Sequence, residues 1–141
     1  MNKNRSRRDS LGLSVANVYR NAKVDFTTTG NTTVYTTPSD SRAIVKNIIV
    51  SEDSNNADSI TITVTDAAGA VFSLFKDKAI SAKATVELIT QPIILQEGEI
   101  LKAQVATADR LHLITSILEI NRDEYVIYRN RSIIQNRDNK W

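Results

Sequence analysis

The chain has 141 residues, about the usual length of one domain, which is enough to bury a hydrophobic core without disulfides or metals. Hydrophobic residues make up 41% and charged residues 24%, as in ordinary soluble proteins. There is no cysteine, which excludes a disulfide framework, thiolate zinc sites and a cysteine nucleophile. No apolar stretch approaches the ~18 residues that a membrane-spanning helix needs.

The net charge of +2 is distributed unevenly along the chain. Residues 1–23 contain six Lys or Arg and one Asp, a net charge of +5. Residues 24–120 have a net charge of −5, and residues 121–141 have +2. Basic ends on an acidic body indicate that the ends contact something that the body does not.

Residues 1–22 are predicted to form a flexible basic N-terminal arm, because they show no strand or helix period and contain few apolar residues. The apolar stretch after the first basic residues is too short and polar for a signal core, so we expect no Sec export. The residues expected to dock this arm on a partner are Arg5, Arg7, Arg8, Leu11, Leu13 and Tyr19.

From residue 23 the pattern changes to short strands separated by turns. The clearest strand is residues 58–66, where Ile60, Ile62 and Val64 alternate with threonines. Turn residues separate the segments and give about eight strands at a spacing typical of sandwiches and barrels. The segments expected to be strands are residues 24–29, 32–37, 42–52, 58–66, 71–76, 84–89, 93–95, 100–106 and 110–120.

These segments predict an all-β fold, a single antiparallel, jelly-roll-like β-sandwich over residues 23–120 with extended arms at both ends. Strict alternation places Ile44, Ile48 and Val50 on one face of their strand. The same rule turns Leu101, Ala103 and Val105 of residues 100–106 inward. In the last strand it places one set of apolar residues on one face (Leu111, Leu113 and Ile117) and a second set on the other (His112, Ile114 and Leu118).

Residues 121–141 are predicted to form a C-terminal arm. Tyr125 and Tyr128 bound a short apolar run that suits either a further strand or a docking segment. Trp141, the only tryptophan, is either a disordered end or a binding anchor, and the two interpretations have equal weight.

No catalytic constellation is recognisable in the sequence. The single histidine, His112, lies in a strand among apolar residues, which favours a structural or interface role over a catalytic base. No nucleophile elbow, phosphate loop or dinucleotide fingerprint occurs. Isolated acidic turns such as Glu97 and Glu99 suit solvated loops better than a glycosidase pair. We therefore expect no enzymatic activity and no cofactor.

Two binding functions also have weak support. The oxygen-bearing group Glu52, Asp53, Asn55, Asn56 and Asp58 lacks the ligand spacing of a calcium loop, so a solvated loop is favoured and no metal is expected. The basic N-terminal arm lacks the interleaved aromatics of single-strand binders, and the acidic body would repel a polyanion. An acidic protein surface is therefore favoured over nucleic acid as the partner.

Three segments resemble tailed-phage virion proteins. Thr32–Ser51 (TTVYTTPSDSRAIVKNIIVS) is similar to a pattern of a VYTxP strand, a polar turn and an AxVKxIxV strand. Ile94–Ala106 resembles the LxxGDxLxAxA segment of the same group, with Glu99 in place of Asp, and Leu113–Ile120 resembles its last strand. The resemblance covers about residues 27–120, and the arms have no counterpart in the pattern.

The resemblance implies a small β-sandwich on a phage particle, as head decoration or cement, neck or tail component. We expect a homo-oligomer that binds other virion proteins (major capsid, portal, neck or tail) and no membrane, in a virion assembled in the host cytoplasm. The alternative is a tail- or fibre-associated module that binds carbohydrate or a host surface, a class that usually exposes aromatics along one face.

Overall fold

The computed structural model describes residues 17–121, and these residues form nine β-strands and no helix. All the predicted arm contacts except Tyr19 therefore lie outside the described residues: Arg5, Arg7, Arg8, Leu11, Leu13, Tyr125, Tyr128 and Trp141. The strands are β1 (Asn17–Asp25), β2 (Thr32–Thr36), β3 (Ser41–Glu52), β4 (Asp58–Thr65), β5 (Val71–Ile80), β6 (Thr85–Glu87), β7 (Ile93–Leu95), β8 (Ile100–Val105) and β9 (Leu111–Asn121).

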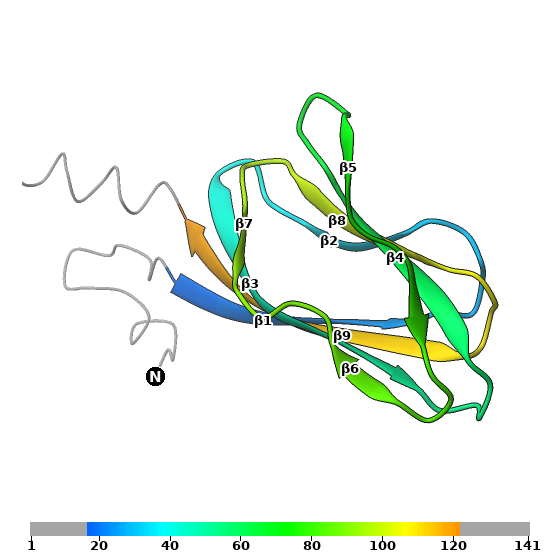
Figure 1. Ribbon diagram of the computed structural model, residues 1–141. Helices are drawn as coiled ribbons and strands as arrows, with labels where there is room; N and C mark the ends of the chain where they lie inside the picture. The colour runs from blue at the N-terminus through cyan, green and yellow to red at the C-terminus, as the bar shows by residue number, and fades with distance from the viewer. Residues whose placement is uncertain (1–16, 122–141) are drawn as a thin grey trace, which may run out of the picture.

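The strands form two antiparallel sheets that pack face to face (Figure 1). One sheet has the order β1-β9-β3-β6, with β7 also pairing with β3, and the other has the order β2-β8-β4-β5. The predicted all-β sandwich is therefore confirmed. Within the described part of the chain, no helix is long and apolar enough to cross a membrane.

The core consists of the inward residues of both sheets. The alternation predicted for β4, β8 and β9 is confirmed, since Ile60 and Ile62 of β4, Leu101 of β8 and Leu113 of β9 are almost fully buried. Val64, on the same face of β4, is partly buried against this core. Aliphatic side chains dominate this interior because the chain has few aromatics, and Phe26 is its largest member. The fully buried core also includes Ile48, Ile80, Leu95, Leu111, Leu113, Ile117, Val45 and Val50.

The first strand begins earlier than the sequence pattern indicates. Residues 17–22 were expected in the arm, but they belong to β1, which pairs with β9 from Asn17↔Ile120 to Asp25↔His112. The alternation of polar and apolar residues in β1 is not recognisable in the sequence, because the charged Arg20 occupies an inward position opposite the buried Ile117. An ion pair with Glu119 makes that position tolerable for a guanidinium.

The predicted faces of β3 are wrong in its first half. The register with β9 shifts between Val45 and Asn47, which leaves Lys46 without a partner as a β-bulge. The extra residue reverses the alternation. Ala43 and Val45 therefore point inward with Ile48 and Val50, whereas Ile44 points outward.

Candidate functional site

The outer face of the five-stranded sheet bears a row of apolar side chains that crosses four strands. Tyr19 of β1 lies opposite Leu118 of β9, Leu118 opposite Ile44 of β3, and Ile44 opposite Ile94 of β7. Directly opposite residues have neighbouring side chains, so these four form one strip, called here the apolar row. Tyr19 is 76% exposed and Ile94 61%, whereas Ile44 and Leu118 are half-buried.

Polar side chains separate the apolar row from the rest of this face. The next row toward the middle of the sheet contains Asn21, Ser116 and Asn47. The Asn47 side-chain oxygen accepts a hydrogen bond of 3.3 Å from the backbone N–H of Ser116, so this polar row is internally bonded. Beyond it Ile114, 43% exposed, lies opposite Ile49. The polar row therefore separates the apolar row from Ile114 and Ile49.

The apolar row lies where both described ends of the chain leave the sheet. β1 starts at Asn17, directly opposite Ile120, and β9 ends at Asn121, opposite Ser41 of β3. These ends lie at the left of the sheet in Figure 1. Tyr19 is two residues from the start of β1, so the apolar row and the two terminal segments share one end of the sandwich.

A charged link joins the two sheets beneath this end of the sandwich. Arg20 Nε of β1 donates to Glu119 Oε2 of β9 at 3.0 Å, and the Tyr35 hydroxyl of β2 donates to the same oxygen at 2.5 Å. Burial and this hydrogen bond raise the pKa of Tyr35 well above its usual range, so the phenol stays protonated at neutral pH. The link holds β1 and β2, two edge strands, side by side.

The opposite end of the sheet has a different chemistry. His112 Nε2 lies 3.2 Å from Asp25 Oδ1, and its Nδ1 lies 3.5 Å from Asp53 Oδ2. Residues 17–121 contain no group of three His, Asp or Glu side chains that is arranged to hold a metal ion. His112 therefore lies between two exposed carboxylates, on a partly exposed face as expected.

The oxygen-rich loop that was weighed as a calcium site is organised by one carboxylate. Glu52 is 2% exposed and accepts bonds from the N–H groups of Ser54 (2.7 Å), Asn55 (3.0 Å) and Lys83 (2.8 Å), and from the Ser54 hydroxyl. Burial alone would raise the pKa of Glu52, but these hydrogen bonds outweigh it and lower the pKa to about 2. Both carboxylate oxygens of Glu52 are thus already occupied by hydrogen bonds from backbone N–H groups.

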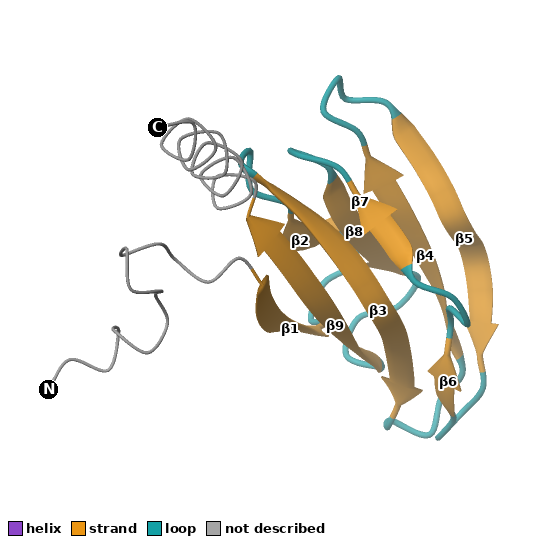
Figure 2. Cartoon of the chain, turned by 90° about the vertical axis from the view of Figure 1, so that its left-hand side faces the viewer, coloured by secondary structure: helices purple, strands orange, loops and turns teal. Residues whose placement is uncertain are grey.

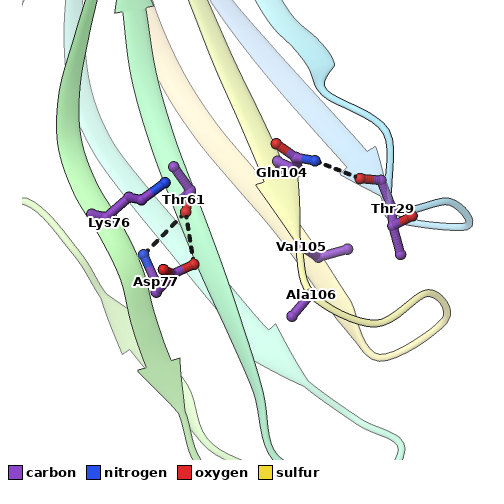
Figure 3. A pocket seen from close by; sticks show the side chains of 7 residues that line it. All are labelled: Thr29, Thr61, Lys76, Asp77, Gln104, Val105 and Ala106. Carbon is purple, nitrogen blue, oxygen red and sulfur yellow. Dashed lines mark hydrogen bonds between the residues drawn. The ribbon is translucent and has the colours of Figure 1, made fainter.

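A shallow polar pocket of about 350 Å³ lies on the outer face of the four-stranded sheet (Figure 3). Thr61 Oγ1 accepts a bond from the Asp77 N–H at 3.0 Å, and Gln104 Nε2 donates to the Thr29 carbonyl at 2.8 Å. Two of its polar side chains, Thr61 and Gln104, are thus hydrogen-bonded to backbone groups of the pocket's own lining. None of its seven lining residues is aromatic, so it offers no stacking platform for a sugar ring.

The sequence identified only Tyr19 among the members of the apolar row. Leu118, Ile44 and Ile94 were missed because they come from strands far apart in the sequence. Their pairing depends on the order β1-β9-β3 and on the bulge at Lys46, which alternation does not reveal.

No family model matches the chain, and no curated protein matches it. Solved structures similar to it include phage capsid proteins. The capsid of Helicobacter pylori bacteriophage KHP30 matches with a TM-score of 0.48 and 12% identity over 76% of this chain and 89% of that chain. A pentameric capsid protein from metagenomic phage sequences has a TM-score of 0.40 and 20% identity, covering 84% of this chain and 73% of that chain.

The structural neighbours also include a bacterial surface fibre. The Bacillus endospore appendage pili match with a TM-score of 0.47 and 8% identity over 75% of this chain and 88% of that chain. All three TM-scores lie below 0.5, so these likenesses carry no argument about what this chain does.

Proposed function

We propose that this chain is a non-enzymatic structural protein of a phage virion that attaches to the capsid or the head–tail neck and decorates or cements it. The observation that carries the proposal is the apolar row, at the end of the sandwich where both terminal segments leave. A group of exposed apolar side chains on the surface of a sheet is typical of a protein-binding surface. The terminal segments, with their basic and aromatic residues, would extend this contact onto neighbouring subunits.

The choice of a virion as the setting depends on the resemblance of residues 32–51, 94–106 and 113–120 to tailed-phage proteins. In the fold, these segments are β2 and β3 with the turn that connects the two sheets, β7 with β8, and most of β9. They therefore include strands that supply Ile44, Ile94 and Leu118 of the apolar row. A structural role is favoured over catalysis because Thr61 and Gln104 of the polar pocket are already hydrogen-bonded to backbone groups, and His112 is the only histidine of the chain.

The test is binding to undecorated phage heads and to isolated tails. The full chain is compared with a Tyr19→Ser/Ile94→Ser variant, which removes the two most exposed members of the apolar row. Burying two such side chains contributes at least ~1.5 kcal/mol each, so we expect binding to weaken by tenfold or more. Ile114→Ser, beyond the polar row on the same face, is the matched control and should bind like the wild type.

Binding to neither particle would contradict the proposal. Retention on a glycan array together with no binding to heads or tails would favour the carbohydrate-binding alternative. Equal weakening by Ile114→Ser would show that the apolar row has no special part in attachment.

A further inference from the structure

Strand β5 has a free edge in the described structure. The four-stranded sheet has the order β2-β8-β4-β5, and within residues 17–121 β5 pairs only with β4. Figure 2 shows β5 at the side of the sandwich farthest from β1. A free edge presents unpaired backbone N–H and C=O groups, which bind another strand unless the edge is blunted.

The second half of β5 is blunted. Ile60 pairs with Lys78 and Ile62 with Phe75, so Lys76 and Asp77 form a bulge between them. Asp77 has a φ of 49°, in the left-handed region, which twists the strand away from a regular ladder. Bulges and adjacent charged side chains are the usual protection of an edge.

The first half of β5 lacks this protection. Val71, Phe72 and Ser73 pair in regular register with Thr65, Val64 and Thr63, and they carry no charge. Val71 is 62% exposed and Phe72 56%. Leu74 is also exposed, but it has no partner in β4, because the register shifts a second time between Ile62↔Phe75 and Thr63↔Ser73. The edge at Val71–Ser73 therefore combines a regular backbone with exposed apolar side chains, as strand-accepting edges do, and a second bulge at Leu74 ends this regular stretch.

A segment of suitable pattern precedes β1. Leu11, Leu13 and Val15 alternate with Gly12 and Ser14, which is the period of a strand, and no charge follows Asp9 before Arg20. The apolar residues after β9 instead occur as consecutive runs, such as Tyr125–Tyr128. Only the segment before β1 matches an uncharged, alternating partner for this edge.

The position of this segment requires a second copy of the chain. Val15 is two residues from Asn17, where β1 starts, and two residues span at most ~7 Å. β5 lies three strand spacings beyond β2, or ~14 Å, across the other sheet. We propose that residues 11–15 of one copy add as a strand to the free edge of β5 at Val71–Ser73 of a second copy.

This contact is heterologous, because the donor segment and the acceptor edge are different surfaces of the chain. Repetition of such a contact builds a ring if the rotation closes and a filament if it does not. The inference goes beyond attachment to a particle, since purified chains would associate without any other virion protein. Failure of self-association would therefore leave the binding test on heads and tails unaffected.

The experiment uses two full-length variants and sedimentation of each alone and mixed. The donor variant carries Leu11→Ser, Leu13→Ser and Val15→Ser, and the acceptor variant carries Phe72→Lys and Leu74→Lys. The wild type should self-associate, and each variant alone should be monomeric. An equimolar mixture should form heterodimers and nothing larger, because only one donor and one acceptor remain. A monomeric wild type, a self-associating acceptor variant or a monomeric mixture would each overturn the proposal.

Disulfide trapping gives a second measurement that does not depend on destabilising substitutions. The chain has no cysteine, so Leu13→Cys in one copy and Ser73→Cys in another can join only with each other or with themselves. We expect the mixed disulfide in several-fold excess over that formed with Thr33→Cys. Thr33 is the matched control, because it is exposed on β2, the other edge of the same sheet. Equal yields at the two positions would overturn the proposed contact.

Discussion

Glu52 is the residue on which two separate loops depend. Its carboxylate accepts backbone N–H bonds from Ser54 and Asn55 after β3, and from Lys83 in the turn before β6. Asn55 and Lys83 both have positive φ, at 66° and 59°, so both loops adopt a conformation that non-glycine residues rarely take. The hydrogen bonds of this one buried carboxylate thus offset the unfavourable backbone conformation of both turns.

Glu52→Gln is expected to lower the melting temperature at pH 7, because an amide NH₂ would face N–H donors in place of one oxygen. The folded-state pKa of Glu52 is about 2, below its ordinary value of 4.5. The stability from this carboxylate is therefore present above pH 4.5 and is lost as the pH falls toward 2. Thermal melts should show the difference between the two proteins shrinking across that window, and a pH-independent difference would contradict this assignment.

Tyr35→Phe is expected to reduce the free energy of unfolding by about 1.5 kcal/mol, since a hydrogen bond to a charged, nearly buried carboxylate is lost. Urea denaturation at pH 7 measures this loss. Because the pKa of Tyr35 is raised in the folded state, wild-type stability should also fall as the pH rises above 10, and the variant should lack that contribution. Equal stability of the two proteins would mean that the Arg20–Glu119 pair alone holds this end together.

At the scale of the element, the β3 bulge decides which side chains β3 presents outward. Val45 pairs with Ile117 and Asn47 with Ser116, so Lys46 is the unmatched residue. Deletion of Lys46 would join two segments that already have the correct facing, and we expect the variant to fold with a modest loss of stability. Deletion of Ile49 would instead turn either Ile48 or Val50 out of the core and should prevent folding. Circular dichroism melts of both deletions test this contrast, and similar behaviour of the two would contradict it.

Alternation predicted β4 and β8, in which apolar residues recur at alternate positions, and it predicted β9 although the inner face of that strand also contains Thr115 and Glu119. It failed where one residue alters the pattern, at Arg20 in β1 and at Lys46 in β3. The apolar row and the exposed edge of β5 were beyond prediction because both depend on strand order. Val71 and Phe72 have the pattern of an ordinary hairpin partner, and only the topology shows that nothing described covers their strand.

At the scale of the whole molecule, the division of the chain into a β-sandwich and two terminal arms remains a prediction. The sandwich now begins at Asn17, the first residue of β1, and not at residue 23. Limited trypsin digestion should cut at Arg8 and Arg122 but spare Arg20 and Lys23, which lie in β1 and are bonded to β9. Mass spectrometry should therefore find a resistant fragment of residues 9–122. Rapid cleavage at Arg20 would contradict the assignment of residues 17–22 to the sheet, and intact ends in a dilute monomer would contradict the arms.

The antiparallel pairing of Asn17 with Ile120 also has a mechanical meaning. If the two terminal segments were anchored on subunits that move apart, the force would peel β1 from β9 one residue pair at a time, as a zipper opens. If both terminal segments were anchored side by side, tension would act on the strands of the sheet all at once. Under load, this protein would therefore resist unfolding better where its two ends are fastened side by side than where they are pulled apart.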